Sequence, residues 1–121
     1  MSESLFFDTY ALFEIIRGNQ NFQTYIEKDI IINDFVYAEL CYNLIKTRHP
    51  KAHELLTQYA QYISQVEPTW IEDAMHFRLK WKDRNVSMTD CIGYIMAQQL
   101  GLRFLTGDKE FEGMENVEFV K

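Results

Sequence analysis

Short apolar runs alternate with longer amphipathic stretches along the chain. The short runs are rich in aromatic and β-branched residues, which is typical of buried β-strands. They predict strands at residues 4–7, 30–32, 64–66, 103–105 and 117–120. The longer stretches carry apolar residues at helical spacing, which predicts helices at about residues 11–17, 21–27, 34–47, 50–62, 69–82 and 88–100.

Local signals mark several helix ends. Asp8 and Thr9 offer a cap for the first helix, and Gly18 ends it. Residues 69–72 (TWIE) and 87–90 (SMTD) both have the form of a capping box, and Pro50 fits the first position of its helix. Strands separated by helices predict an α/β fold, a three-layer α/β/α sandwich with a mostly parallel central sheet.

The chain length limits the organisation of this fold. With 121 residues, the chain is long enough for one core and too short for two, so we expect a single domain over residues 1–121. The sequence contains neither a bilayer-spanning apolar run nor a signal-peptide pattern at its start, and we therefore expect a cytoplasmic protein. Cys41 and Cys91 do not form a CxxC pair, and we expect both to behave as small buried side chains.

Four acidic residues that are distant in sequence fall at one edge of the predicted sheet. Asp8 directly follows the first strand, and Asp108 comes three residues after Leu105. Glu39 lies about one turn into its helix and Asp90 lies in the first turn of another, so both point toward the same edge. Because ligands of parallel sheets bind beyond the carboxyl ends of the strands, we expect the four acids to form one site.

Such a cluster of carboxylates is costly unless a cation offsets the repulsion. All the candidate ligands are oxygens, which favours Mg²⁺ or Mn²⁺ over zinc. A divalent ion can lower the pKa of a bound water and neutralise a phosphate, and this chemistry fits hydrolysis of a phosphodiester. Each acid also has an ordinary explanation as a helix cap, a solvated helix residue or a turn residue, and the residue pattern leaves both explanations open.

The formal net charge is −6, from 12 basic and 18 acidic residues. Taken alone, this charge argues against a nucleic-acid partner, but two bound divalent cations would reduce it to −2, so it does not decide the partner. The basic stretch RLKWKDR covers residues 78–84. On a helix its cations spread around the axis, which favours a solvated face over a contact with single-stranded RNA.

Four motifs resemble those of the PIN-domain family, and the resemblance extends from Leu5 to Val120. The motifs are LFFDTYALFEIIRGN with Asp8 and Thr9, FVYAELCYNL with Glu39, VSMTDCIGYIMAQQLGL with Asp90, and RFLTGDKEF with Thr106 and Asp108. Their order and spacing, together with the short chain, are most similar to the VapC-type toxins of toxin–antitoxin pairs.

This resemblance implies a Mg²⁺- or Mn²⁺-dependent endoribonuclease that leaves a 5′-phosphate and a 3′-hydroxyl. It implies an acidic metal site at Asp8, Glu39, Asp90 and Asp108, supported by the hydroxyl of Thr106. It also implies an RNA substrate, a homodimer, and a small antitoxin whose tail enters the active-site groove.

Two residues depart from the family pattern. Tyr10 stands where a small residue such as Ser is common, and its ring could narrow the groove. Cys91 stands where Ala is usual, and we expect it to fill the same space. A PIN nuclease of RNA processing and a catalytically inactive PIN-like binding module remain alternatives. A haloacid dehalogenase phosphatase or a receiver domain would need further acids beside Asp8, and the sequence does not carry them.

Overall fold

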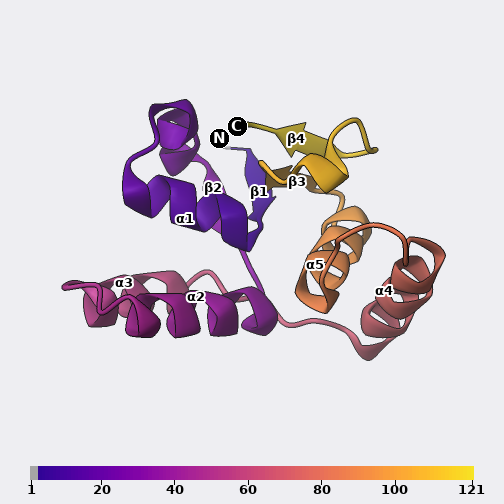
Figure 1. The fold of residues 1–121 in the computed structure, drawn as a ribbon, viewed down its shortest axis with the longest axis horizontal. Coiled ribbons are helices and arrows are strands. Elements are labelled where there is room, and N and C mark those ends of the chain that lie inside the picture. The colour runs from indigo at the N-terminus through magenta and orange to yellow at the C-terminus, as the bar shows by residue number, and fades with distance from the viewer. Residues whose placement is uncertain (1–2) are drawn as a thin grey trace.

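The computed structural model describes residues 3–121 and contains one central sheet (Figure 1). Its strands are β1 (Ser4–Phe7), β2 (Asp29–Ile31), β3 (Arg103–Thr106) and β4 (Val117–Phe119). The strands are all parallel and lie in the order β2-β1-β3-β4. The predicted parallel sheet is therefore confirmed, with β1 and β3 at its centre.

Helices connect these strands and flank the sheet. The α-helices are α1 (Thr9–Arg17), α2 (Asp34–Lys46), α3 (Ala52–Ala60), α4 (Pro68–Lys80) and α5 (Met88–Gln99), and the 3₁₀ helices are η1 (Gln20–Glu27) and η2 (Lys109–Phe111). In Figure 1, α2 and α3 lie side by side as one pair, and α4 lies beside α5. None of the helices within residues 3–121 has the length and hydrophobicity needed to cross a membrane.

Side chains of the sheet alternate between two helical layers. Phe6 and Phe104 lie on neighbouring strands with ring centroids 5.8 Å apart, and both rings contact α5 at Gly93. Because successive side chains of a strand point to opposite faces, Leu5 and Phe7 face the layer that contains α1. All four of these strand side chains are buried. The expected three-layer α/β/α arrangement is confirmed.

Side-chain caps fix the starts of the helices that approach the carboxyl edge of the sheet. Asp8 and Asn33 each accept a hydrogen bond from a backbone N–H three residues later, at 2.8 and 2.9 Å. The capping box of Ser87 and Asp90 is present, with both hydrogen bonds at 3.0 Å. Gly18 ends α1 with φ of 85°, a conformation that glycine adopts without strain.

The strand predicted at residues 64–66 is wrong. A single bridge between Ile32 and Ile63 extends the sheet there, and the chain between this bridge and α4 pairs with no other strand of the described residues. The capping box predicted at residues 69–72 is also wrong. Thr69 lies inside α4, because Pro68 supplies the first helical residue and needs no N–H partner.

Two other helix ends differ from the prediction. The helix expected from Pro50 begins at Ala52, and Pro50 lies in the turn before it. The helix expected to reach about residue 82 ends at Lys80, and Trp81 caps it. Residues after Trp81 therefore leave the helix axis, which changes where the last cations of the basic stretch lie.

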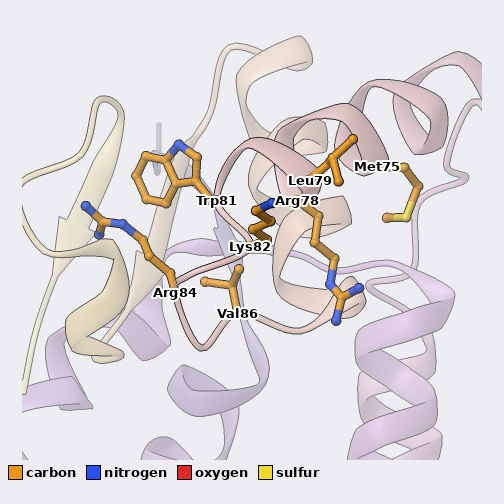
Figure 2. A pocket seen from close by; sticks show the side chains of 7 residues that line it. All are labelled: Met75, Arg78, Leu79, Trp81, Lys82, Arg84 and Val86. Atoms are coloured by element: carbon orange, nitrogen blue, oxygen red, sulfur yellow. The ribbon is translucent and has the colours of Figure 1, made fainter.

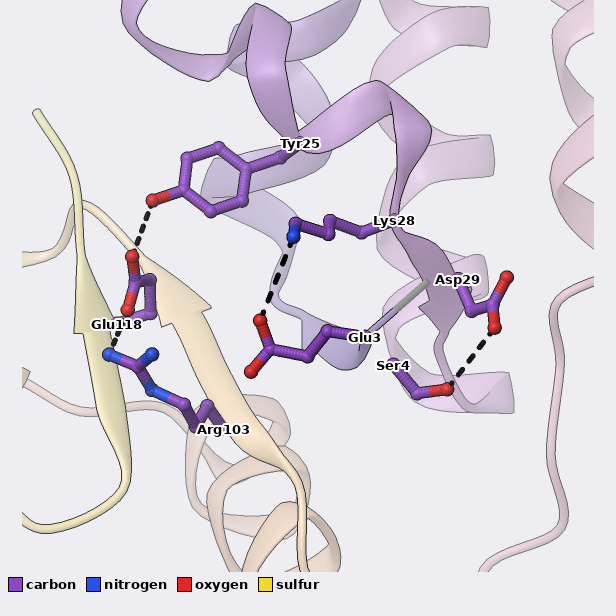
Figure 3. A network of polar contacts seen from close by, with 7 residues as sticks. All are labelled: Glu3, Ser4, Tyr25, Lys28, Asp29, Arg103 and Glu118. Carbon is purple, nitrogen blue, oxygen red and sulfur yellow. Dashed lines mark hydrogen bonds and ion pairs between the residues drawn. The ribbon is translucent and has the colours of Figure 1, made fainter. Parts of the chain in front are cut away.

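A polar network joins η1 to the far strands of the sheet (Figure 3). Tyr25 of η1 donates a hydrogen bond to Glu118 of β4, and Glu118 also pairs with Arg103 of β3. Lys28 reaches Glu3 at 3.9 Å. Exposed ion pairs contribute only about 0–1 kcal/mol each, so we infer that this network orients η1 more than it stabilises the fold.

Candidate active site

The carboxyl ends of β1 and β3 bring Asp8, Thr106 and Asp108 to one edge of the sheet. The N–H of Asp8 donates to the carbonyl of Leu105 at 3.1 Å, which holds the two strand ends side by side. Asp8 is 3% exposed and Thr106 is fully buried. The N–H of Asp108 donates to the hydroxyl of Thr106 at 3.0 Å. The two aspartates thus lie at the edge where the topology predicts them.

Glu39 and Asp90 reach the same edge from α2 and α5. The hydroxyl of Thr9 donates to Oε1 of Glu39 at 2.7 Å, which joins the start of α1 to α2. The charge of Asp90 raises the pKa of Asp8, and the charge of Glu39 raises the pKa of Asp90. The fold therefore couples all four acids electrostatically, although the sequence separates them widely.

Burial is the largest influence on the two most perturbed acids. Burial, with smaller contributions from the charges of Asp90 and Asp108, raises the pKa of Asp8 from 3.8 to about 8. A hydrogen bond from the Thr106 hydroxyl lowers the pKa of Asp8 but does not compensate for burial. Burial also raises the pKa of Asp90, against the hydrogen bonds of its capping box. The site thus holds buried acidic groups that a proton or a cation would stabilise.

The chemistry of these donors fits a hard divalent cation. Carboxylate and hydroxyl oxygens are ligands that Mg²⁺ and Mn²⁺ prefer, and a cation would offset the mutual repulsion of the acids. Within residues 3–121, however, no three acidic, His or Cys side chains converge closely enough to enclose an ion. Each acid instead gives an oxygen to a local donor, at 2.7–3.0 Å. The acids are neighbours without forming a closed ligand shell.

Thr9 is a residue of this site that the sequence analysis did not assign. Its hydroxyl fixes one carboxylate oxygen of Glu39, so it sets the orientation of that side chain. Thr106 has a comparable function, because its hydroxyl accepts from the N–H of Asp108 and donates to Asp8. The position of Thr9 directly after Asp8, within the first of the four motifs, is the sequence signal that could have indicated its contribution.

The two departures from the family pattern have clear structural roles. The ring of Tyr10 lies against Gly107 and has its centroid 6.2 Å from that of Phe22, so it packs beneath the turn that leads to Asp108. Cys91 is fully buried, as expected for a residue that fills the space of an alanine. Burial, together with the charge of neighbouring Asp90, raises the pKa of the Cys91 thiol to about 11, so it stays protonated at neutral pH.

The chain belongs to the PIN domain family, whose profile matches residues 5–117. Its fold is similar to that of a toxin–antitoxin complex from Klebsiella pneumoniae, with a TM-score of 0.78 and 19% identity over 94% of this chain and 95% of the other. It is also similar to VapC20 of Mycobacterium tuberculosis, described as a toxin that cleaves the sarcin–ricin loop. That match has a TM-score of 0.79 and 16% identity over 97% and 99% of the two chains.

A third similar structure is VapBC2 from Rickettsia felis bound to a DNA fragment from its promoter. The TM-score is 0.73, with 16% identity over 98% of this chain and 99% of the other. No curated protein sequence matches the chain. Identities this low establish a shared fold, while family membership rests on the match to the PIN domain.

The raised pKa of Asp8 predicts that the metal-free protein loses stability as the pH rises. The folded state keeps Asp8 protonated up to a pH of about 8, whereas the unfolded chain ionises it near 3.8. The folded state therefore binds more protons between these values, and the free energy of unfolding falls as the pH rises through them. Asp8→Asn keeps a side chain that can cap α1 but removes the titrating carboxyl group. The free energy of unfolding of this variant should therefore fall less steeply as the pH rises. Urea denaturation in EDTA over this pH range gives the pH dependence of the free energy of unfolding for the wild type and the variant. Equal slopes for the two proteins would contradict a protonated Asp8 in the folded state.

Gly107→Ala should destabilise the turn before Asp108. An added Cβ would lie 2.2 Å from the Tyr10 ring and 2.4 Å from the carbonyl oxygen of Val120, and the latter is backbone that cannot rotate away. We expect a loss of about 1–3 kcal/mol in the free energy of unfolding. Gly113→Ala is the control, because its φ of 83° is strained for alanine but its Cβ meets nothing within 4 Å. If urea denaturation showed a larger loss in the free energy of unfolding for Gly113→Ala than for Gly107→Ala, close packing at Gly107 would not be the dominant constraint on the turn.

Proposed function

We propose that this protein is a Mg²⁺- or Mn²⁺-dependent endoribonuclease and the toxin of a VapBC-type toxin–antitoxin pair acting in the cytoplasm. The observation that carries the proposal is the electrostatic coupling of Asp8, Glu39, Asp90 and Asp108 at the carboxyl edge of a PIN-domain sheet. The similarity to a toxin described as cleaving the sarcin–ricin loop supports RNA as the substrate.

Each residue has a distinct part in the proposed reaction. Asp8, Asp90 and Asp108 would hold the divalent ion directly or through water, and the ion would supply Lewis acidity and neutralise phosphate charge. Glu39 orients the attacking water or accepts its proton, and its hydrogen bond to a hydroxyl of α1 limits its rotation. Thr106 keeps two of the aspartates at the strand ends. Cleavage leaves a 5′-phosphate and a 3′-hydroxyl.

Cleavage of a labelled single-stranded RNA tests this proposal. The wild-type protein should cleave in Mg²⁺ or Mn²⁺, stop in EDTA, and recover when the metal is restored. Asp8→Asn and Asp90→Asn should each lower the rate by at least about 100-fold, because each removes a carboxylate ligand of the proposed metal site. Asp73→Asn, an exposed position of α4, is the matched control and should cleave like the wild type.

Two results would overturn the proposal. Full activity of Asp8→Asn would show that the acidic edge does not carry the chemistry, and cleavage that persists in EDTA would exclude metal dependence. A wild-type protein that never cleaves RNA would instead favour the inactive PIN-like binding module.

An open cavity beside Glu39 supports the proposed antitoxin partner. It has a volume of about 400 Å³, lies between α1 and α2, and is lined by Thr9, Phe13, Ala38, Glu39, Tyr42 and Asn43. Tyr42 and Ile45 of α2 are 68% and 66% exposed, so they leave apolar surface beside this cavity that a partner can cover. A peptide segment in this cavity would contact Glu39 and so reach the edge of the proposed active site.

Co-expression with the product of an adjacent short reading frame should yield a stable complex without RNase activity. Tyr42→Ala should weaken this complex, because an exposed aromatic side chain often provides much of the binding energy of an interface. Gln58→Ala, at an exposed position of α3, should have no effect. Affinity can be measured by titration calorimetry, and a complex insensitive to Tyr42→Ala would place the partner elsewhere.

A further inference from the structure

A cationic pocket lies where α4 ends and the chain turns toward α5 (Figure 2). Its volume is about 390 Å³, and Arg78, Lys82 and Arg84 line it together with Trp81 and Val86. We propose that this cationic pocket binds backbone phosphates of the RNA strand beside the four acids. The proposal rests on the ribonuclease function proposed above and assigns a substrate-binding surface to it.

The end of α4 creates this concentration of charge. A longer helix would distribute the cations of the basic stretch around its axis, as the sequence analysis expects. Instead, α4 ends at Lys80, and the turn after Trp81 brings Lys82 and Arg84 to the same pocket as Arg78. In Figure 2 the side chains of Arg78 and Arg84 extend away from each other, and Lys82 lies between them.

Two of these cations are available to an anionic ligand. Arg78 and Lys82 are exposed, and within residues 3–121 neither forms a hydrogen bond or an ion pair with a carboxylate. Like charges held around one pocket repel each other, and a phosphate between them removes this cost. Neutralising phosphates with Lys and Arg also releases the counterions of the nucleic acid, which drives binding.

Arg84 has a different role, because it is already held in place. Its guanidinium carbon lies 3.9 Å from the centroid of the Trp81 ring, and its Nη1 donates to the carbonyl of Glu110 at 2.9 Å. Glu110 belongs to η2, which begins directly after Asp108. Arg84 therefore forms a fixed wall of the pocket and ties that wall to the segment carrying one of the four acids.

The pocket also adjoins the start of α5. Val86 lines it and directly precedes Ser87, whose capping box holds Asp90. An RNA strand with one phosphate at the acids must carry its next phosphates over adjoining surface. The cationic pocket is an adjoining surface with unpaired positive charges, and within residues 3–121 Lys109, directly after Asp108, adds another exposed cation near the acids.

Binding of a fluorescein-labelled single-stranded RNA of mixed sequence, followed by anisotropy with the full chain in EDTA, tests the pocket without cleavage. Arg78→Ala/Lys82→Ala should raise the Kd about tenfold or more. It should also reduce the salt dependence of binding, by about 0.7 in the logarithmic slope for each lost phosphate contact. Lys46→Ala/Lys51→Ala removes two exposed cations near α3 and is the matched control. We expect the control to bind RNA almost as tightly as the wild type.

The outcomes separate this proposal from the ribonuclease proposal. If the wild type cleaves RNA in Mg²⁺ but the pocket variant binds and cleaves equally well, the pocket proposal is overturned and the nuclease stands. If the pocket variant loses RNA binding while the wild type never cleaves, the pocket stands and the nuclease proposal fails. Equal losses in the pocket and control variants, or a preference of the pocket for poly-glutamate over RNA, would also overturn the pocket proposal.

Discussion

The buried carboxyl group of Asp8 links the stability of this fold to the chemistry of its edge. The side chain caps α1, and the backbone N–H of the same residue joins the ends of β1 and β3. Its surroundings favour the neutral form, so at neutral pH the group retains a proton unless a cation replaces it. A residue that served only as a cap could remain solvated and keep an ordinary pKa. Burying an acid costs free energy, and a cation bound at this site would offset that cost.

The strand order explains how acids from four parts of the chain meet. β1 and β3 are adjacent, although most of the sequence lies between them, so the turns that follow them share one edge. The connection from β2 to β3 contains both α2 and α5, and the N-terminal halves of these helices carry Glu39 and Asp90 toward the same edge. Close packing limits the movement of these parts, because Gly93 lets α5 approach Phe6 and Gly107 accommodates the ring of Tyr10.

Features with a local cause could be predicted from the sequence. The caps at Asp8 and Ser87 and the buried central strands depend on neighbouring residues, and they lie where expected. The false strand at residues 64–66 could not be recognised locally, because strand pairing depends on segments distant in sequence. The turn after α4 is held by a distant contact between Arg84 and the carbonyl of Glu110, which no local pattern encodes. The four acids could be assigned to one edge of the sheet because the carboxyl ends of the predicted parallel strands define that edge. The hydrogen bond between Thr9 and Glu39 could not be predicted, since it depends on how α1 and α2 pack together.

The net charge of −6 gives a misleading impression of what this surface can bind. At physiological ionic strength the Debye length is about 8 Å, so acids on remote surfaces hardly weaken the potential of a local cationic cluster. What an approaching RNA strand experiences is the field of the nearest few side chains. Here unpaired cations adjoin a cluster of acids that would bind divalent metal. Both features attract phosphate when the metal is present, and without it the acids repel the strand. Metal binding would then control substrate affinity as well as the chemical step.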